Sequence, residues 1–217
     1  MANIEAPNAS ALVLVDLQND FCPGGALAVP QGDAVIPIVN RLASLFGFVA
    51  ATQDWHPPNH ISFKKQGGDW PPHCIQGTFG AQLHPGLETS NIDMVAKKAF
   101  SPERDVFEGL EAVDTYAVKL DAALRQREIS TVYVAGLATD YCVRSTVLDA
   151  LDKGYQVYAI VDAMRAVDVR PDDGARAVEE MEAHGAHLVT SAQILTAAAR
   201  RSKAPSNIAN RTGTAGA

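Results

Sequence analysis

Short, nearly continuous apolar runs alternate with helical patterns along most of the 217-residue chain. The first run, ALVLVDL at residues 11–17, has the apolar content of a strand that is buried on both faces. Similar runs lie at residues 48–52, 94–98, 131–138, 155–161 and 187–190. Because helical crossovers cover both faces of a parallel sheet, the alternation predicts a Rossmann-like α/β protein with three α/β/α layers and a central, mainly parallel sheet.

The segments between these runs space their apolar residues at helical intervals. The predicted helices span residues 34–46, 114–127, 141–153 and 172–184, and an Ala-rich helix follows the last strand. Asp33 is a candidate N-cap for the first of them, and Gly47 is a candidate stop. No repeat or linker divides the pattern, so we expect residues 1–201 to form one domain, followed by a flexible polar tail at 202–217.

Charge and composition exclude several classes of protein. The chain has 18 Lys and Arg against 25 Asp and Glu, and its strongest basic cluster is Arg200 with Arg201, so we expect neither nucleic acid nor a membrane as a partner. No apolar stretch approaches the roughly 18 residues that cross a membrane, and we find no secretory signal. The chain has three cysteines, an odd number that does not suggest a set of disulfide bonds, and this favours a reducing compartment. These features are typical of a cytoplasmic enzyme or small-molecule binder.

Asp16 and Lys98 both stand at the ends of predicted strands, where open α/β sheets bind their ligands. Burying a carboxylate is costly unless it has a partner. Asp16 is therefore either a functional carboxylate of the site or a structural residue that accepts hydrogen bonds from the N–H groups of a turn. Lys98 could be a solvated surface residue. If it points inward, it would hold a neighbouring thiol and carboxylate in their charged forms, while Lys97 faces the opposite side.

Cys142 follows the predicted strand at residues 131–138 and opens the next predicted helix. At a helix N-terminus we expect the pKa of the thiol to be lowered, and the free N–H groups of the turn can form an oxyanion hole. The alternative is an inert buried cysteine. We assign that role to Cys22 and Cys74, which have no comparable placement.

Residues 53–87 form a long irregular segment that holds four of the six His and both Trp, and such a segment is usually functional. Asp54 and His56 project to the same side of an extended stretch, and His73 could join them. Three ligands of this type suit one divalent ion such as Zn, Fe or Mn. His60 is a candidate for a fourth or a supporting position. The alternative is a hydrogen-bonded loop aspartate with surface histidines.

Together these residues resemble the nicotinamidase family within the isochorismatase-like hydrolases, over roughly residues 10–195. The similarity rests on DLQNDF at 16–21, QDWHPPNHISF at 53–63 with WPPHCIQGTFGAQLHPGL at 70–87, Lys98, and GLATDYCVRSTVLDA at 136–150. The resemblance implies hydrolysis of nicotinamide to nicotinate and ammonia through a cysteine thioester, in NAD salvage. It also implies activity on pyrazinamide and a homo-oligomeric assembly.

The resemblance further assigns roles to individual residues and places a cis peptide at Leu137–Ala138. In this assignment a metal ion binds the pyridine nitrogen and two aromatic side chains enclose the ring. The implied residues are Asp16, Lys98 and Cys142 for catalysis, the N–H groups of Ala138 and Cys142 for the oxyanion hole, Asp54, His56 and His73 for the metal, and Phe21, Trp70, Leu137 and Tyr141 for the substrate.

The segment after Lys98 departs from the family pattern. Ala99 stands where the family commonly has Gly, and Val106-Phe107-Glu108 replaces a Ser-Tyr-Ser-like stretch, so one wall of the pocket is open to question. Two other functions remain. One is another amidohydrolase of the same superfamily, acting on a carbamoyl or maleamic substrate and generally lacking the metal loop. The other is a non-catalytic binding protein of doubly wound fold.

Overall fold

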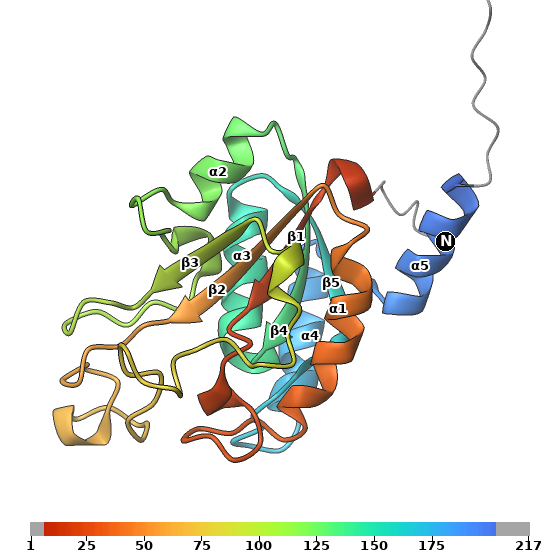
Figure 1. The fold of residues 1–217 in the computed structure, drawn as a ribbon. Helices are drawn as coiled ribbons and strands as arrows, with labels where there is room; N and C mark the ends of the chain where they lie inside the picture. Colours follow the sequence, from red (N-terminus) through yellow and green to blue (C-terminus); the bar gives the residue numbers. More distant parts are fainter. Residues whose placement is uncertain (1–6, 203–217) are drawn as a thin grey trace, which may run out of the picture.

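The protein is built around one parallel sheet (Figure 1). The computed structural model describes residues 7–202 of the chain. The strand order is β3-β2-β1-β4-β5-β6, and all five neighbouring pairs are parallel. The strands are β1 (Ala11–Val15), β2 (Phe48–Asp54), β3 (Met94–Lys98), β4 (Thr131–Leu137), β5 (Gln156–Arg165) and β6 (His187–Val189). The predicted parallel sheet is therefore confirmed.

Helices cover both faces of the sheet, as the buried apolar runs predicted. On one face lie α1 (Ile36–Ala43) and α5 (Ser191–Ser202), and on the other lie α2 (Leu120–Gln126), α3 (Arg144–Asp152) and α4 (Asp173–Ala183). Strand β1 is apolar throughout because both of its faces are buried. Leu12 and Leu14 pack toward the first helix layer, and Val13 packs toward the second. The three-layer α/β/α architecture is confirmed.

Two helix predictions are wrong in their bounds. Helix α1 begins at Ile36, after a 3₁₀ turn at Gly32–Val35 that contains Asp33, and no side chain caps its N-terminus. The predicted helix at 114–127 is reduced to α2, because the Asp114 carboxylate accepts the N–H groups of Tyr116 and Val118 and holds the chain in a turn.

The predicted helix at 141–153 starts two residues earlier and in a different form. Thr139–Val143 is a π-helical turn, and α3 continues from it. Among the described residues, no helix is both long and apolar enough to cross a membrane. The predicted tail at 202–217 lies outside the described residues except for Ser202, the last residue of α5.

The strand order reverses between β1 and β4, and this point places the ligand crevice at their carboxyl ends. Gly136 allows the two strands to approach closely there. Its φ is +125°, and a Cβ at this position would lie 2.1 Å from the Val15 carbonyl oxygen. The Leu137–Ala138 peptide that follows is cis, as the resemblance implied.

Candidate active site

Four neighbouring strands each deliver one charged or nucleophilic side chain to the same crevice. Asp16 follows β1, Asp54 and Lys98 end β2 and β3, and Cys142 lies in the turn after β4. Lys98 Nζ is 2.9 Å from Asp16 Oδ2 and donates a hydrogen bond to Cys142 Sγ at 3.3 Å. All four side chains are buried. The structure therefore brings together the three residues that the sequence predicted as a catalytic group.

Lys98 also binds Asp54, a contact that the sequence analysis did not anticipate. Its ammonium donates to Asp54 Oδ1 and, at 3.3 Å, to the Val106 carbonyl oxygen. The register of β2 and β3 causes this pairing, because Asp54 and Lys98 are direct partners across the two strands. The predicted metal ligand and the predicted catalytic lysine thus belong to one charged group.

A threonine holds Asp16 in position. The Thr52 hydroxyl donates to Asp16 Oδ1 at 2.6 Å and accepts the Asp16 N–H at 3.2 Å. Asp16 has a φ of +49°, a conformation that is uncommon for residues other than glycine. The backbone turn and the hydroxyl together aim the carboxylate at Lys98 and Cys142.

Burial sets the protonation of this group. It raises the pKa of Asp16 above the usual 3.8 and the pKa of the Cys142 thiol well above the usual 9.0, while the Lys98 ammonium opposes both shifts. Burial also disfavours a charged Lys98, but the carboxylates of Asp16 and Asp54 raise its pKa well above 10.5. The predicted lowering of the thiol pKa is therefore wrong, because burial outweighs the helix N-terminus. The resting group holds a thiol and an ammonium.

Asp54, His56 and His73 offer three ligand atoms within 4.8 Å of one another. Each imidazole points its Nδ1 at a carbonyl oxygen, of Ala99 at 3.3 Å and of Pro71 at 2.8 Å, so each Nε2 keeps its lone pair. His56 Nε2 faces Asp54 Oδ2 at 3.4 Å. Two acceptors this close favour a cation between them, so the residues fit a divalent ion.

His60 supports this group without offering a nitrogen to it. Its Nε2 donates to the Arg104 carbonyl oxygen at 3.1 Å, and its Nδ1 accepts from the Ser62 hydroxyl at 2.7 Å. The ring packs against His56, with 4.1 Å between the ring centroids. Both nitrogens of His60 are therefore engaged in hydrogen bonds.

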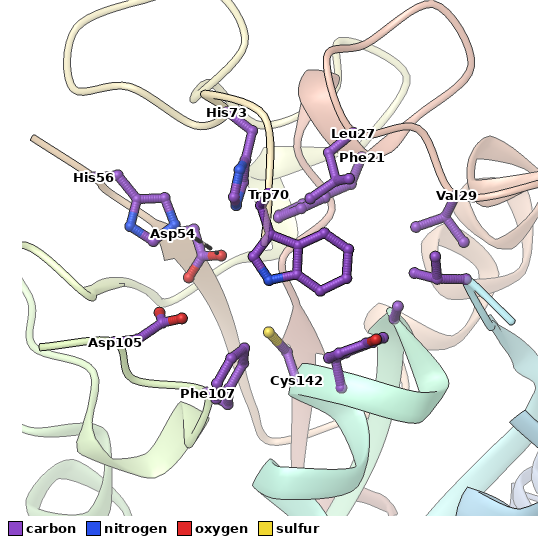
Figure 2. Close-up of a pocket in the computed structure, with 13 residues that line it drawn as sticks. Phe21, Leu27, Val29, Asp54, His56, Trp70, His73, Asp105, Phe107 and Cys142 are labelled. Atoms are coloured by element: carbon purple, nitrogen blue, oxygen red, sulfur yellow. Dashed lines mark ion pairs between the residues drawn. The ribbon is translucent and has the colours of Figure 1, made fainter. Parts of the chain in front are cut away.

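A narrow pocket lies over Cys142, between the histidines and a set of aromatic side chains (Figure 2). Trp70 packs edge-to-face on Tyr141, with ring centroids 5.2 Å apart. Leu137, predicted to contact substrate, is absent from the lining; it is fully buried among core residues that include those of α1. The residues that line the pocket are Phe21, Leu27, Val29, Asp54, His56, Trp70, His73, Asp105, Phe107, Ala138, Tyr141, Cys142 and Val167.

Gln18, which the sequence analysis passed over, fixes the backbone of Asp54. Its side-chain amide donates to the carbonyl oxygens of Asp54 and Ala81 at 2.8 and 2.9 Å and accepts the Asp54 N–H at 2.8 Å. Asp20 similarly accepts the N–H of Cys74 at 2.7 Å. A signal was present, because Asp16, Gln18 and Asp20 are polar at every second position after an apolar strand.

The chain is similar to known proteins over most of its length. Residues 10–193 match the family described as "Isochorismatase domain". The nicotinamidase of Escherichia coli is 46% identical over 202 residues, covering 84% of this chain and 95% of that protein.

Solved structures are similar over comparable lengths. Pyrazinamidase of Pyrococcus horikoshii in complex with zinc has a TM-score of 0.76 and 42% identity, with 84% of this chain and 99% of that chain covered. PnC1 from L. infantum in complex with nicotinate has a TM-score of 0.79 and 36% identity, with 87% and 96% covered.

Proposed function

The chain belongs to the isochorismatase family, and on that basis we propose that it is an amide hydrolase that converts nicotinamide to nicotinate and ammonia. The observation that carries this proposal is the position of Lys98, whose ammonium is 2.9 Å from the Asp16 carboxylate and 3.3 Å from Cys142 Sγ. This group lies beneath a pocket whose walls are aromatic side chains and possible metal ligands. The 46% identical nicotinamidase supports the same substrate.

The first step forms a thioester from the resting thiol. Cys142 Sγ lies within 4.8 Å of a carboxylate oxygen of Asp16, which takes the thiol proton while Lys98 stabilises the resulting thiolate. Sγ attacks the carboxamide carbon, and the backbone N–H groups of Ala138 and Cys142 hold the developing oxyanion. Losing one such donor typically costs about 100- to 1,000-fold in turnover.

Asp16 then returns the proton. The C–N bond breaks, the nitrogen takes the proton from Asp16 and leaves as ammonia, and the carbonyl carbon stays bound to Sγ. Water attacks the thioester while Asp16 accepts one of its protons. The C–S bond breaks, Cys142 regains its thiol proton, and nicotinic acid is released.

Asp54, His56 and His73 would hold one divalent ion, for which Zn, Fe and Mn are the candidates. When bound, the ion supplies a Lewis-acid partner for the ring nitrogen of the substrate. Phe21 and Trp70 line the same pocket and offer flat apolar faces to the ring. We extend the proposal to pyrazinamide as a second substrate, and to a cytoplasmic homo-oligomer that acts in NAD salvage.

Ammonia release from nicotinamide by the purified protein tests this function. We expect turnover that disappears with chelator, returns with added Zn²⁺, Mn²⁺ or Fe²⁺, and is absent in Cys142→Ala. Cys22→Ala is the matched control, because Cys22 is also buried but lies outside the pocket lining. Near-native turnover in Cys142→Ala would refute the nucleophile, and no turnover by the metal-loaded wild type would refute the substrate.

A further inference from the structure

Asp105 is a carboxylate in the pocket wall that the mechanism above does not use. It is half-buried, lies seven residues after Lys98, and lines the pocket beside His56. One of its oxygens lies within 4.8 Å of ring nitrogens of both His56 and His60. Figure 2 shows the carboxylate pointing toward His56 and Asp54, from the side of the pocket opposite His73.

The carboxylate has spare binding capacity. Its Oδ1 accepts the neighbouring Val106 N–H at 3.1 Å. Among the side chains of residues 7–200, no Lys, Arg or His forms an ion pair with it. A half-buried carboxylate favours a cationic partner, and this one points toward the metal-ligand group.

His56 belongs to two groups of possible ligands, with Asp54 and His73 on one side and with His60 and Asp105 on the other. A neutral imidazole has one lone pair, so His56 can bind only one ion. The nitrogens of His60 are both engaged. The second group therefore does not form a separate site, and Asp105 lies beside the position of the same ion.

Charge balance favours the same conclusion. A divalent ion and Lys98 bring three positive charges into a buried region that holds the carboxylates of Asp16 and Asp54. Lys98 already binds one oxygen of Asp54, so that carboxylate is shared between the ammonium and the ion. Asp105 supplies the third negative charge, which lowers the cost of burying the ion.

We propose that Asp105 is a positioning residue of the metal centre, whose carboxylate accepts hydrogen bonds from water ligands of the divalent ion and strengthens its binding. This inference rests on the metal site of the proposed function. By holding the waters, Asp105 would also fix the ion relative to the ring that enters the pocket.

Zn²⁺ affinity of the metal-free protein, measured by competition with a chelating dye, tests the role of Asp105. Outer carboxylates of metal sites typically contribute about 10- to 100-fold in affinity. We expect Asp105→Asn to weaken Zn²⁺ binding by that amount and Asp105→Glu to restore part of it. Glu103→Gln is the matched control: it removes the same charge two residues away, from an exposed side chain, and should leave the affinity unchanged.

The outcomes separate this inference from the function on which it rests. Wild-type affinity in Asp105→Asn would overturn the role of Asp105. Equal weakening in Glu103→Gln would overturn it too, since the effect would then be one of net charge. Absence of Zn²⁺ binding by the wild type would overturn the ligand set itself. Thermal unfolding of each metal-free variant shows whether the fold is intact, and we expect the Asp105→Asn midpoint to match the wild type.

Discussion

Lys98 joins two chemical tasks in one side chain. Its ammonium contacts the carboxylate of Asp16, which takes the thiol proton in the proposed mechanism, and the carboxylate of Asp54, which is a proposed metal ligand. Both contacts are buried, so removing the lysine would leave two buried carboxylates without their partner. A change at either carboxylate therefore alters the electrostatics of the other.

The hydroxyl of Thr52 should tune the pH dependence of turnover. Its hydrogen bond to Asp16 lowers the pKa of that carboxyl against the larger, opposite effect of burial. Removing the hydroxyl in Thr52→Val should raise the Asp16 pKa further. Because Asp16 must be ionised to take the thiol proton, activity is present above this pKa and is lost as the pH falls through it. We expect the acid limb of kcat/KM to move up by about one pH unit.

Thr52→Ser provides the matched comparison, because it keeps the hydroxyl and removes only a methyl group. Its kcat/KM profile should keep the wild-type acid limb. An unshifted acid limb in Thr52→Val, or the same shift in both variants, would contradict the role assigned to the hydroxyl.

At this scale the sequence could identify Asp16, Lys98 and Cys142 as neighbours, because the carboxyl ends of parallel strands meet at one edge. It could not provide the pairing of Lys98 with Asp54, which depends on the register between β2 and β3. Nor could it provide the direction of the thiol pKa, which depends on how deeply the completed fold buries Cys142.

Among the secondary-structure elements, the junction of β1 and β4 depends on one glycine. In Gly136→Ala the new Cβ would lie 2.1 Å from a backbone oxygen, in a left-handed conformation. We expect a loss of about 3–5 kcal/mol in the free energy of unfolding, from strain and overpacking together, measured by urea denaturation. Turnover should fall as well, because the Asp16 and Cys142 segments would separate.

Gly154→Ala isolates the contribution of the backbone conformation. Gly154 also has a positive φ, of +85°, but an added Cβ meets nothing within 4 Å. Its cost should be about 1–2 kcal/mol, with turnover retained. Equal losses of stability in the two variants would contradict this prediction, because the close approach of β1 and β4 would then add nothing to the cost of the backbone conformation.

The strands were easier to predict than the helices. Buried parallel strands are apolar throughout, and this signal located β1 and β4 to within a residue or two. The length of helix α2 was overestimated because the Asp114 carboxylate accepts backbone N–H groups and holds the chain in a turn. The spacing of apolar residues does not reveal such a turn. The Thr139–Val143 turn was described as an ordinary helix start, since apolar spacing does not distinguish a π-helical turn from an α-helical one.

For the molecule as a whole, metal binding should contribute measurably to stability. An ion that binds only the folded state adds about 2.7 kcal/mol when its free concentration is 100 times its Kd. For a chain of this size that corresponds to about 5–10 °C in the thermal midpoint. We expect added Zn²⁺ to raise the midpoint of the metal-free wild type by this amount, and to leave the double variant His56→Ala, His73→Ala unchanged. Full metal occupancy in the double variant would refute the ligand set.

The site is assembled from two kinds of support. In the proposed mechanism, the groups that break the amide bond lie at the carboxyl ends of strands β3, β1 and β4, whereas Trp70, His73, Asp105 and Phe107 lie on the connections above the sheet. Bond breaking and ring selection can therefore diverge separately. Insertions or substitutions in the connections change which amide is held, and the sheet preserves the hydrolytic chemistry beneath them.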